Sequence, residues 1–246
     1  MSSGKKDKLF LSPFEEISDF RFDAGVVEVF EDMIERSVPG YSAILGMTGE
    51  LAQQFAQPNT KIYDLGCSLG GSSLSMAQRE LTNGVSIIAL DSSAPMVEGL
   101  KSKISVLPQK AIPLEVRQED IRTTEFELSS FVVMNFTLQF IPPQERSELI
   151  RKIFDALAPG GALLLSEKIK FSDDSTDELI SDLHHNFKKS MGYSDLEISQ
   201  KRAAIENILL PETSETHIQR MLDAGFSQAS PWFQCFNFCS FLAVKS

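Results

Sequence analysis

Residues 61–72, KIYDLGCSLGGS, decide the fold, because a short apolar strand runs directly into a loop rich in glycine and serine. Glycines in such a loop let the chain turn tightly and bring backbone N–H groups close to a ligand. A second apolar strand, residues 85–90, leads to Asp91, which follows Gly71 by 20 residues. An acidic side chain at that distance typically accepts hydrogen bonds from ribose hydroxyls. The pattern favours a nucleoside-containing ligand over the alternative, a plain turn with Asp91 as a helix cap.

After residue 91, apolar stretches alternate with segments that have a helical period. Three further apolar stretches are expected to be strands, namely residues 114–117, 131–135 and 162–166. Segments with a helical period separate them, and the helix that begins at Pro143 is expected to stop at Pro159-Gly160-Gly161. Short apolar strands separated by helices predict a parallel sheet with helices on both faces. The sequence therefore predicts a doubly wound, Rossmann-like α/β fold.

The chain outside these strands is expected to be mostly helical. Residues 1–57 are predicted to form an N-terminal leader and lid helices, and residues 58–246 the ligand-binding α/β domain. Within the leader, residues 1–20 are expected to be mobile, with Lys5, Lys6, Asp7 and Lys8 in solvent. A polar helical insert is expected at about 174–208, and an aromatic-rich segment at 230–244 reads as two closing strands.

Composition excludes several classes of function. The 246 residues carry 23 basic and 34 acidic side chains, a formal net charge of −11. Such a chain disfavours direct nucleic-acid binding, which depends on lysine and arginine. Three cysteines cannot supply a disulfide framework or a four-thiolate zinc site, and no metal is expected. No apolar run suits a signal peptide or a membrane span, so we expect a cytoplasmic protein without membrane contact.

The acidic residues around the glycine loop narrow the choice of nucleoside. Asp64 precedes Gly66 by two residues, and Asp120 follows the third strand. The loop resembles the Asp-x-Gly-x-Gly-x-Gly pattern of class I methyltransferases that use S-adenosyl-L-methionine, with Ser68 at the middle glycine. A degraded dinucleotide fingerprint is the alternative. The resemblance implies that the first loop holds the methionine moiety, the acid after the second strand the ribose, and the residues after the third strand the adenine.

The end of the fourth strand argues against one kind of methyl transfer. Enzymes that methylate the exocyclic amines of bases resemble one another in an Asn/Asp-Pro-Pro-aromatic motif at this place. Here Asn135 is followed by Phe136 and Thr137, and no proline occurs before Pro142. Amine methylation of a base is therefore disfavoured. A purely structural role for Asn135, as a partner for carbonyls or a turn at the strand end, is the other interpretation.

Five longer segments carry a more specific resemblance: residues 36–41, 63–70, 135–140, 192–202 and 232–238. Together they resemble the carboxy-S-adenosyl-L-methionine synthase family of the bacterial pathway to tRNA wobble-uridine 5-oxyacetate, over about residues 8 to 245. The resemblance implies conversion of S-adenosyl-L-methionine and prephenate into carboxy-S-adenosyl-L-methionine and phenylpyruvate by a homodimer. Two alternatives stay open: a conventional methyltransferase acting on a small molecule or on tRNA, and a binding module without turnover.

The same resemblance implies a set of site residues. Arg202 would hold the new carboxylate, either within its own subunit or across an interface. Ser92 stands where the family commonly has asparagine, and both side chains can donate a hydrogen bond to a ribose. The residues implied to line the S-adenosyl-L-methionine site, besides Arg202, are Tyr41, Gly66, Cys67, Ser68, Asp91, Ser92, Asp120, Ile121 and Asn135.

Residue chemistry supports Arg202 independently of the resemblance. The implied product bears an extra carboxylate and prephenate carries two, and a guanidinium fork is the expected partner for such groups. The alternative is that the segment around Arg202 is a solvated helix face. We expect the neighbouring lysines (Lys188, Lys189 and Lys201) at the surface, His184 and His185 in polar surface or capping positions, and Cys67 as a passive thiol.

Overall fold

The structure is a computed structural model that describes residues 5–13, 20–106 and 113–246. Within these residues seven strands form one sheet in the order β3-β2-β1-β4-β5-β7-β6. Strands β1 to β5 are parallel, whereas β7 runs antiparallel to β5 and β6 antiparallel to β7. The strands are β1 (Lys61–Leu65), β2 (Ser86–Asp91), β3 (Leu114–Gln118), β4 (Ser129–Asn135), β5 (Leu157–Lys168), β6 (Gln228–Cys235) and β7 (Phe238–Val244). The predicted doubly wound fold is confirmed.

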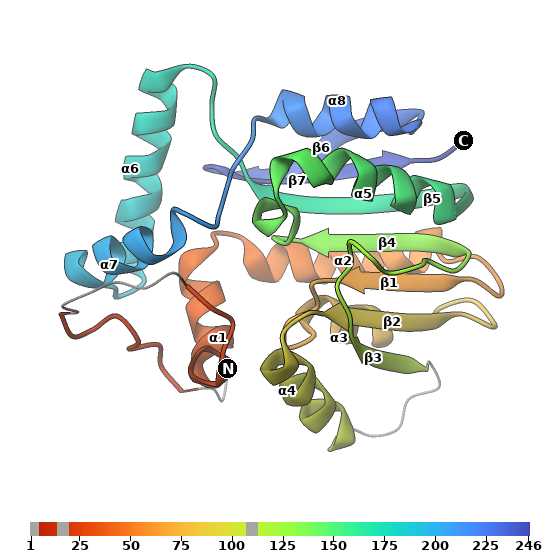
Figure 1. Ribbon diagram of the computed structural model, residues 1–246, viewed down its shortest axis with the longest axis horizontal. Coiled ribbons are helices and arrows are strands. Elements are labelled where there is room, and N and C mark those ends of the chain that lie inside the picture. Colours follow the sequence, from red (N-terminus) through yellow and green to blue (C-terminus); the bar gives the residue numbers. More distant parts are fainter. Residues whose placement is uncertain (1–4, 14–19, 107–112) are drawn as a thin grey trace.

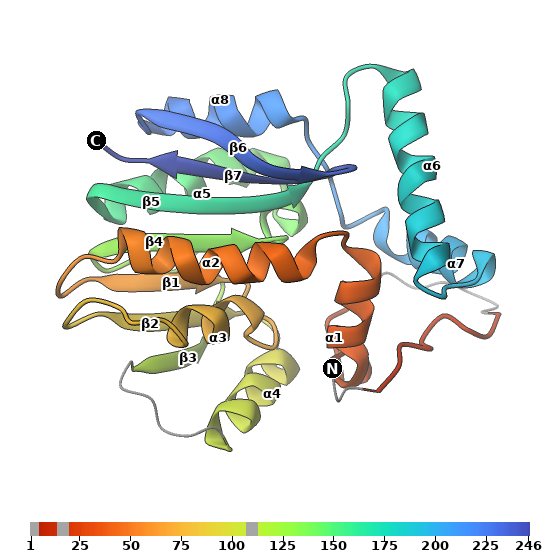
Figure 2. The same ribbon diagram turned by 180° about the vertical axis from the view of Figure 1, so that it is seen from behind.

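Helices cover both faces of the sheet. Figure 1 shows α5 and α8 in front of it, and Figure 2 shows α2 and α3 on the opposite face. The helices are α1 (Ala24–Ser37), α2 (Tyr41–Phe55), α3 (Gly71–Ala77), α4 (Ala94–Ser105), α5 (Pro143–Ala156), α6 (Asp174–Ser190), α7 (Asp195–Ile205) and α8 (Ser214–Ala224), with a 3-10 turn, η1 (Leu138–Phe140). None of the described helices is both long and apolar enough to cross a membrane.

The alternating direction of side chains along each strand explains why helices pack on both faces of the sheet. Successive side chains of a strand point to opposite faces of the sheet. Tyr63 accordingly packs with residues of α5 and α8, such as Ile153 and Met221, whereas Ile62 packs with Ala52 of α2 and with α3. Because both faces are covered, the central strands are apolar along most of their length, which is why they could be recognised in the sequence.

One boundary differs from the prediction. Helix α5 ends at Ala156, and β5 begins at Leu157, so Pro159-Gly160-Gly161 lies inside the strand rather than at the end of the helix. The backbone N–H of Gly160 donates to Lys245, and that of Lys245 donates to Gly161, which pairs this part of β5 with the chain that follows β7. Pairing with a later segment therefore overrides the local turn signal.

At the beginning of the chain Lys5, Lys6 and Lys8 are exposed as predicted, but Asp7 contradicts the predicted solvated leader. Asp7 is only 2% exposed and accepts a hydrogen bond from the Tyr193 hydroxyl at 2.5 Å. Its backbone N–H donates to Asp32 of α1 at 2.7 Å, and Gln200 of α7 donates to the carbonyls of Phe10 and Ser12. Residues 5–13 therefore run across α1 and α7 and join them. Residues 1–4 and 14–19 of the predicted leader lie outside the described residues.

Candidate active site

A cavity of about 720 Å³ lies at the carboxyl ends of the parallel strands, lined also by α1, α6 and α7. That volume suits a small-molecule ligand, and this edge is where doubly wound sheets bind ligands. Figure 1 shows α1, α6 and α7 together beyond the tips of β1 and β4. The cavity lining includes all ten residues expected at the site: Tyr41, Gly66, Cys67, Ser68, Asp91, Ser92, Asp120, Ile121, Asn135 and Arg202. The fold thus brings them together, while their binding roles stay a prediction.

The glycine loop is held in one conformation from both ends. Gly66 has a φ of +76°, and a Cβ there would lie 2.2 Å from Oγ1 of Thr137, so only glycine fits. The Asp64 carboxylate accepts hydrogen bonds from the N–H and the hydroxyl of Ser73, at 2.9 and 2.5 Å. Burial raises the pKa of Asp64 to about 6. Asp64 therefore anchors the first turn of α3 beneath the loop.

Asp91 links this loop to the next helix. One carboxylate oxygen accepts the N–H of Ser68 at 2.9 Å, and the other accepts that of Ser93, the N-cap of α4, at 2.8 Å. The carboxylate is thus a helix-start partner, as the alternative interpretation held. Each oxygen retains a further lone pair, so the same carboxylate can also accept ligand hydroxyls. Burial raises the pKa of Asp91.

The residues expected near an adenine differ in environment. Asp120 receives a hydrogen bond from Nη2 of Arg122 at 2.6 Å, and this partner holds the pKa of Asp120 below its usual value. Ile121 is buried and offers the cavity an apolar side chain. Ser92 is exposed at the rim. An apolar surface flanked by polar groups is typical of a site for a purine ring.

Two of the predicted residues carry weakly acidic groups: Cys67 is buried and Tyr41 is partly buried. Burial is the main cause that raises the pKa of the Cys67 thiol far above its usual value, with Asp64 and Asp91 adding to the effect. A protonated thiol is a poor nucleophile, which agrees with a passive Cys67. Burial likewise raises the pKa of Tyr41, so its hydroxyl stays protonated at the start of α2.

The amide of Asn135 is already committed to protein partners. Its Nδ2 donates to the Ser72 hydroxyl at 2.9 Å, and its Oδ1 accepts from the Ser166 hydroxyl at 2.6 Å. The Ser166 hydroxyl in turn lies 2.5 Å from that of Ser240. This network ties the end of β4 to α3, β5 and β7. The structural interpretation of Asn135 therefore describes its amide, although the residue also borders the cavity.

Sequence reasoning missed Glu167, which is fully buried at the end of β5. Its two carboxylate oxygens accept the N–H groups of Leu138 and Gln139 at 2.8 and 2.9 Å. These contacts hold η1, which follows Phe136, a residue with a left-handed φ of 61°. Burial raises the pKa of Glu167 to about 8. In the sequence Glu167 reads as an ordinary polar strand end, and nothing local signals its burial.

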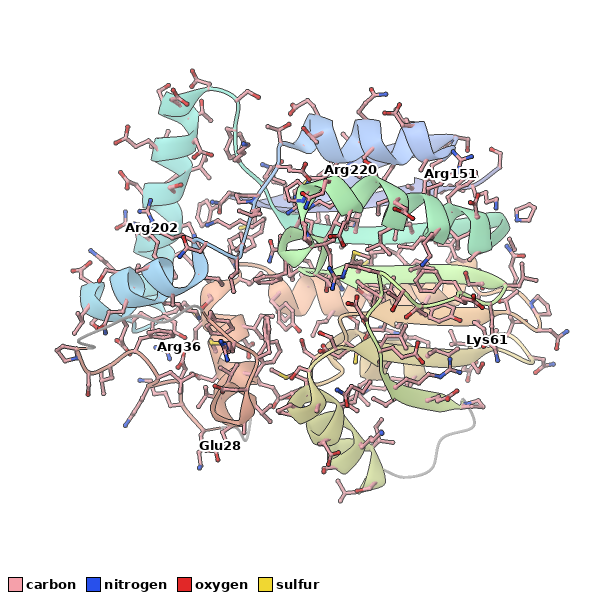
Figure 3. All side chains as sticks on the ribbon, viewed as in Figure 1. Glu28, Arg36, Lys61, Arg151, Arg202 and Arg220 are labelled. Atoms are coloured by element: carbon pink, nitrogen blue, oxygen red, sulfur yellow. The ribbon has the colours of Figure 1, made fainter. Side chains whose placement is uncertain are left out.

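The opposite end of the cavity is basic. It is lined by Lys168 of β5, Lys188 of α6, and Lys201 and Arg202 of α7. The prediction that Lys188 and Lys201 lie at the surface is wrong, since both are partly buried, and burial lowers their pKa values to about 7 and 8. Arg202 is exposed at the rim, where α7 lies beside α6 (Figure 3).

His184 was expected either at the surface or in a capping position, and the structure shows the capping position. The ring is buried, not at the surface, and burial lowers its pKa to about 3. Its Nε2 lies 2.8 Å from the carbonyl of Ser37, the last residue of α1. A neutral ring that donates there caps the helix end, which is the expected capping role. His185 lines the cavity and is partly buried.

The charges of the cavity are therefore unevenly distributed, although Arg122 pairs with Asp120 at the acidic end and Asp177 lines the basic end. Carboxylates lie along the ends of β1, β2 and β3, at Asp64, Asp91 and Asp120, whereas the ends of β5, α6 and α7 supply cations. Such a site can hold a nucleoside with cationic groups at one end and an anion at the other. In the described part of the chain, no group of three or more His, Cys, Asp or Glu side chains could hold a metal ion.

Comparison with known proteins identifies the fold. Residues 62–161 match the family model described as a methyltransferase domain. The fold is similar to that of a Synechocystis magnesium protoporphyrin IX methyltransferase with bound SAH, with a TM-score of 0.60, 16% identity and 87% of each chain covered. This places the chain in the class I methyltransferase fold.

Relatives of similar length are much closer in sequence. The chain is 52% identical to the carboxy-S-adenosyl-L-methionine synthase of Vibrio cholerae over 98% of this chain and 97% of that protein. It is 50% identical to the protein of the same name from Photobacterium profundum, over 100% of both chains. Identity at this level, over nearly the whole length of both chains, shows that the chain belongs to the carboxy-S-adenosyl-L-methionine synthase family.

Proposed function

We propose that this enzyme converts S-adenosyl-L-methionine and prephenate into carboxy-S-adenosyl-L-methionine and phenylpyruvate. The observation that carries the proposal is the division of one cavity into a nucleoside end with carboxylates and a basic end under α6 and α7. Prephenate is a dianion, and the product is an adenosyl sulfonium compound with one added carboxylate. The two ends of the cavity therefore match the two reactants in charge.

At the nucleoside end, backbone N–H groups of residues 66–68 would hold the methionine part of S-adenosyl-L-methionine. The Asp91 carboxylate, with Ser92 beside it, would accept the ribose hydroxyls, and Asp120 with Ile121 would border the adenine. Tyr41 and Asn135 complete the lining from α2 and β4. The narrow approach at Gly66, where no side chain fits, supports close contact between loop and ligand.

At the basic end, Arg202 would hold the carboxylate that is transferred. In the overall reaction the ring carboxyl group leaves prephenate and forms a carbon–carbon bond with the S-methyl carbon. The ring hydroxyl leaves as water with one proton of that methyl group, and the ring becomes aromatic. The sulfonium of S-adenosyl-L-methionine supplies the acidity of the methyl group. The protein's part is to orient both reactants and to exclude water.

The surrounding segments fit this task. Residues 1–57 and the helical insert at about 174–208 would act as the cover of the 58–246 domain, with α1, α6 and α7 lining the cavity. We further propose a cytoplasmic homodimer that binds neither membrane nor nucleic acid itself. Its product would serve a separate enzyme that modifies the tRNA wobble uridine.

Replacement of Arg202 with alanine tests the proposal. The variant, incubated with prephenate and S-adenosyl-L-methionine, should form at least ~100-fold less carboxylated product by mass spectrometry, because a charge-assisted carboxylate contact is lost. Binding of S-adenosyl-L-methionine, measured by calorimetry, should persist. Arg151→Ala, which changes an arginine that is 60% exposed on α5, is the matched control and should behave as wild type (Figure 3).

Two results would contradict the proposal. Wild-type turnover in Arg202→Ala would remove Arg202 from the site. Transfer of an isotope-labelled methyl group to an acceptor, with no mass increase of the S-adenosyl compound, would instead identify a conventional methyltransferase.

A further inference from the structure

Two lysines in the basic end have no side-chain partner in the part of the chain that the structure describes. Lys168 lies at the end of β5 and Lys188 in the last turn of α6, and both line the cavity. Within residues 5–13, 20–106 and 113–246, neither ammonium group has a hydrogen bond or an ion pair. The next lysine of α6, Lys189, is exposed and pairs with Asp195 at 2.6 Å. Of these two neighbouring lysines of α6, only the one that lines the cavity lacks a partner among the described residues.

This arrangement is costly unless an anion binds. Burial lowers the pKa of both lysines, to about 7 for Lys188, and the charge of Arg202 lowers both further. The charge of Asp177 raises the pKa of Lys168 and so favours its protonated form. The Oδ1 of Asp177, however, already accepts the N–H of Phe171 at 2.8 Å. Like charges gathered in a partly buried place favour binding of a negatively charged ligand.

A neighbouring amide is unsatisfied as well. Asn237, between β6 and β7, is 3% exposed, and its Oδ1 has no hydrogen-bond partner among the described residues. Lys168 pairs with Phe238 across β5 and β7, and the carbonyl of Asn237 accepts the N–H of Ile169 at 2.8 Å. Asn237 and Lys168 therefore border the same part of the cavity. A buried acceptor without a partner costs free energy, which a bound ligand with a hydroxyl group can recover.

We propose that Lys168 and Lys188 bind the side-chain carboxylate of prephenate, the one that phenylpyruvate retains. The inference rests on the proposed function, in which Arg202 takes the ring carboxylate that is transferred. A dianion needs two separate cationic contacts, and the structure offers them on different elements: Arg202 on α7 at the rim, and the lysine pair on β5 and α6.

Kinetics with varied prephenate at saturating S-adenosyl-L-methionine test the proposal. Lys168→Met and Lys188→Met should each raise the KM for prephenate at least ~10-fold, since an ionic contact to the carboxylate is lost. The Kd for S-adenosyl-L-methionine should stay within about 2-fold of wild type. Lys188→Arg keeps the charge and should restore most of the affinity, and it also serves if a methionine variant fails to fold. Lys189→Met is the matched control and should leave KM unchanged.

The pH profile provides a second measurement. Binding needs protonated Lys188, whose pKa in the free enzyme is about 7, so kcat/KM for prephenate should fall as pH rises through 7 to 8. In Lys188→Arg this fall should move to higher pH, because arginine does not titrate there. The charged or titratable groups around Lys188 in the same cavity are Lys168, Asp177, His184, His185, Lys201 and Arg202.

The outcomes separate the two proposals. If wild type makes the carboxylated product but both methionine variants keep the wild-type KM, the lysine assignment is wrong and the proposed function stands. The assignment is also wrong if the methionine variants lose S-adenosyl-L-methionine affinity as strongly as prephenate affinity, which would indicate a general structural role. If wild type makes no carboxylated product from prephenate, the proposed function itself fails.

Discussion

Replacing Gly66 with alanine tests the central feature of the nucleotide loop. Gly66 directly follows β1 with a φ of +76°, and an added Cβ would lie 2.2 Å from Oγ1 and 2.5 Å from Cγ2 of Thr137. The loop cannot move away freely, because Ser68 donates to Asp91 and Asp64 holds α3. The methyl group must therefore distort either the loop or the turn after β4.

The expected magnitude follows from two contributions. A left-handed backbone costs a residue with a Cβ roughly 1–2 kcal/mol. Forcing an additional methyl group into a packed site costs roughly 1–3 kcal/mol. The sum of roughly 2–5 kcal/mol should lower Tm by roughly 4–20 °C in a chain of this size. Because the same backbone is expected to contact the methionine moiety, the Kd for S-adenosyl-L-methionine should rise at least ~10-fold.

Circular dichroism melting and calorimetric titration measure both effects. Gly46→Ala is the matched control, since Gly46 lies inside α2 and an added Cβ there meets nothing within 4 Å. It should leave the ligand Kd unchanged and should not lower Tm, because alanine is the better helix former. If Gly66→Ala melts and binds like Gly46→Ala, the loop is not constrained as the structure indicates, and our reasoning about its close approach to a ligand is wrong.

Two further predictions concern groups that the fold buries. Tyr193→Phe removes the hydroxyl that donates to the buried Asp7 carboxylate, and should lower stability by ~1.5–3 kcal/mol, seen as a lower Tm. An unchanged Tm would mean that this hydrogen bond contributes nothing to stability. The pKa of His184 is about 3 in the folded protein against ~6.5 unfolded, so the unfolded state binds more protons and stability falls as pH drops below ~6.5. At pH 5 the free energy of unfolding, measured with urea, should be ~2 kcal/mol lower for this reason. His184→Gln should lack this part of the pH dependence. Equal pH dependence in both proteins would contradict a buried neutral ring.

Local pattern was enough to predict the sheet and the place of the site. The central strands are buried on both faces, so each appears as a short apolar run, and the glycine loop follows the first of them. In a parallel sheet the carboxyl ends of neighbouring strands meet at one edge. Residues as distant in sequence as Gly66, Asp91, Asp120 and Asn135 could therefore be assigned to one cavity before the structure was considered.

Tertiary contacts decided what the polar side chains do. Lys188 and Lys189 are adjacent lysines of one helix, yet only Lys188 lines the cavity, because α6 turns that side toward β5. Asp7 and Glu167 sit in segments that resemble any solvated leader or strand end, and each is buried by partners far along the chain. Burial and hydrogen bonding depend on which distant segments come together. A short stretch of sequence does not contain that information, and so the place of Lys188 in the cavity became visible only in the folded chain.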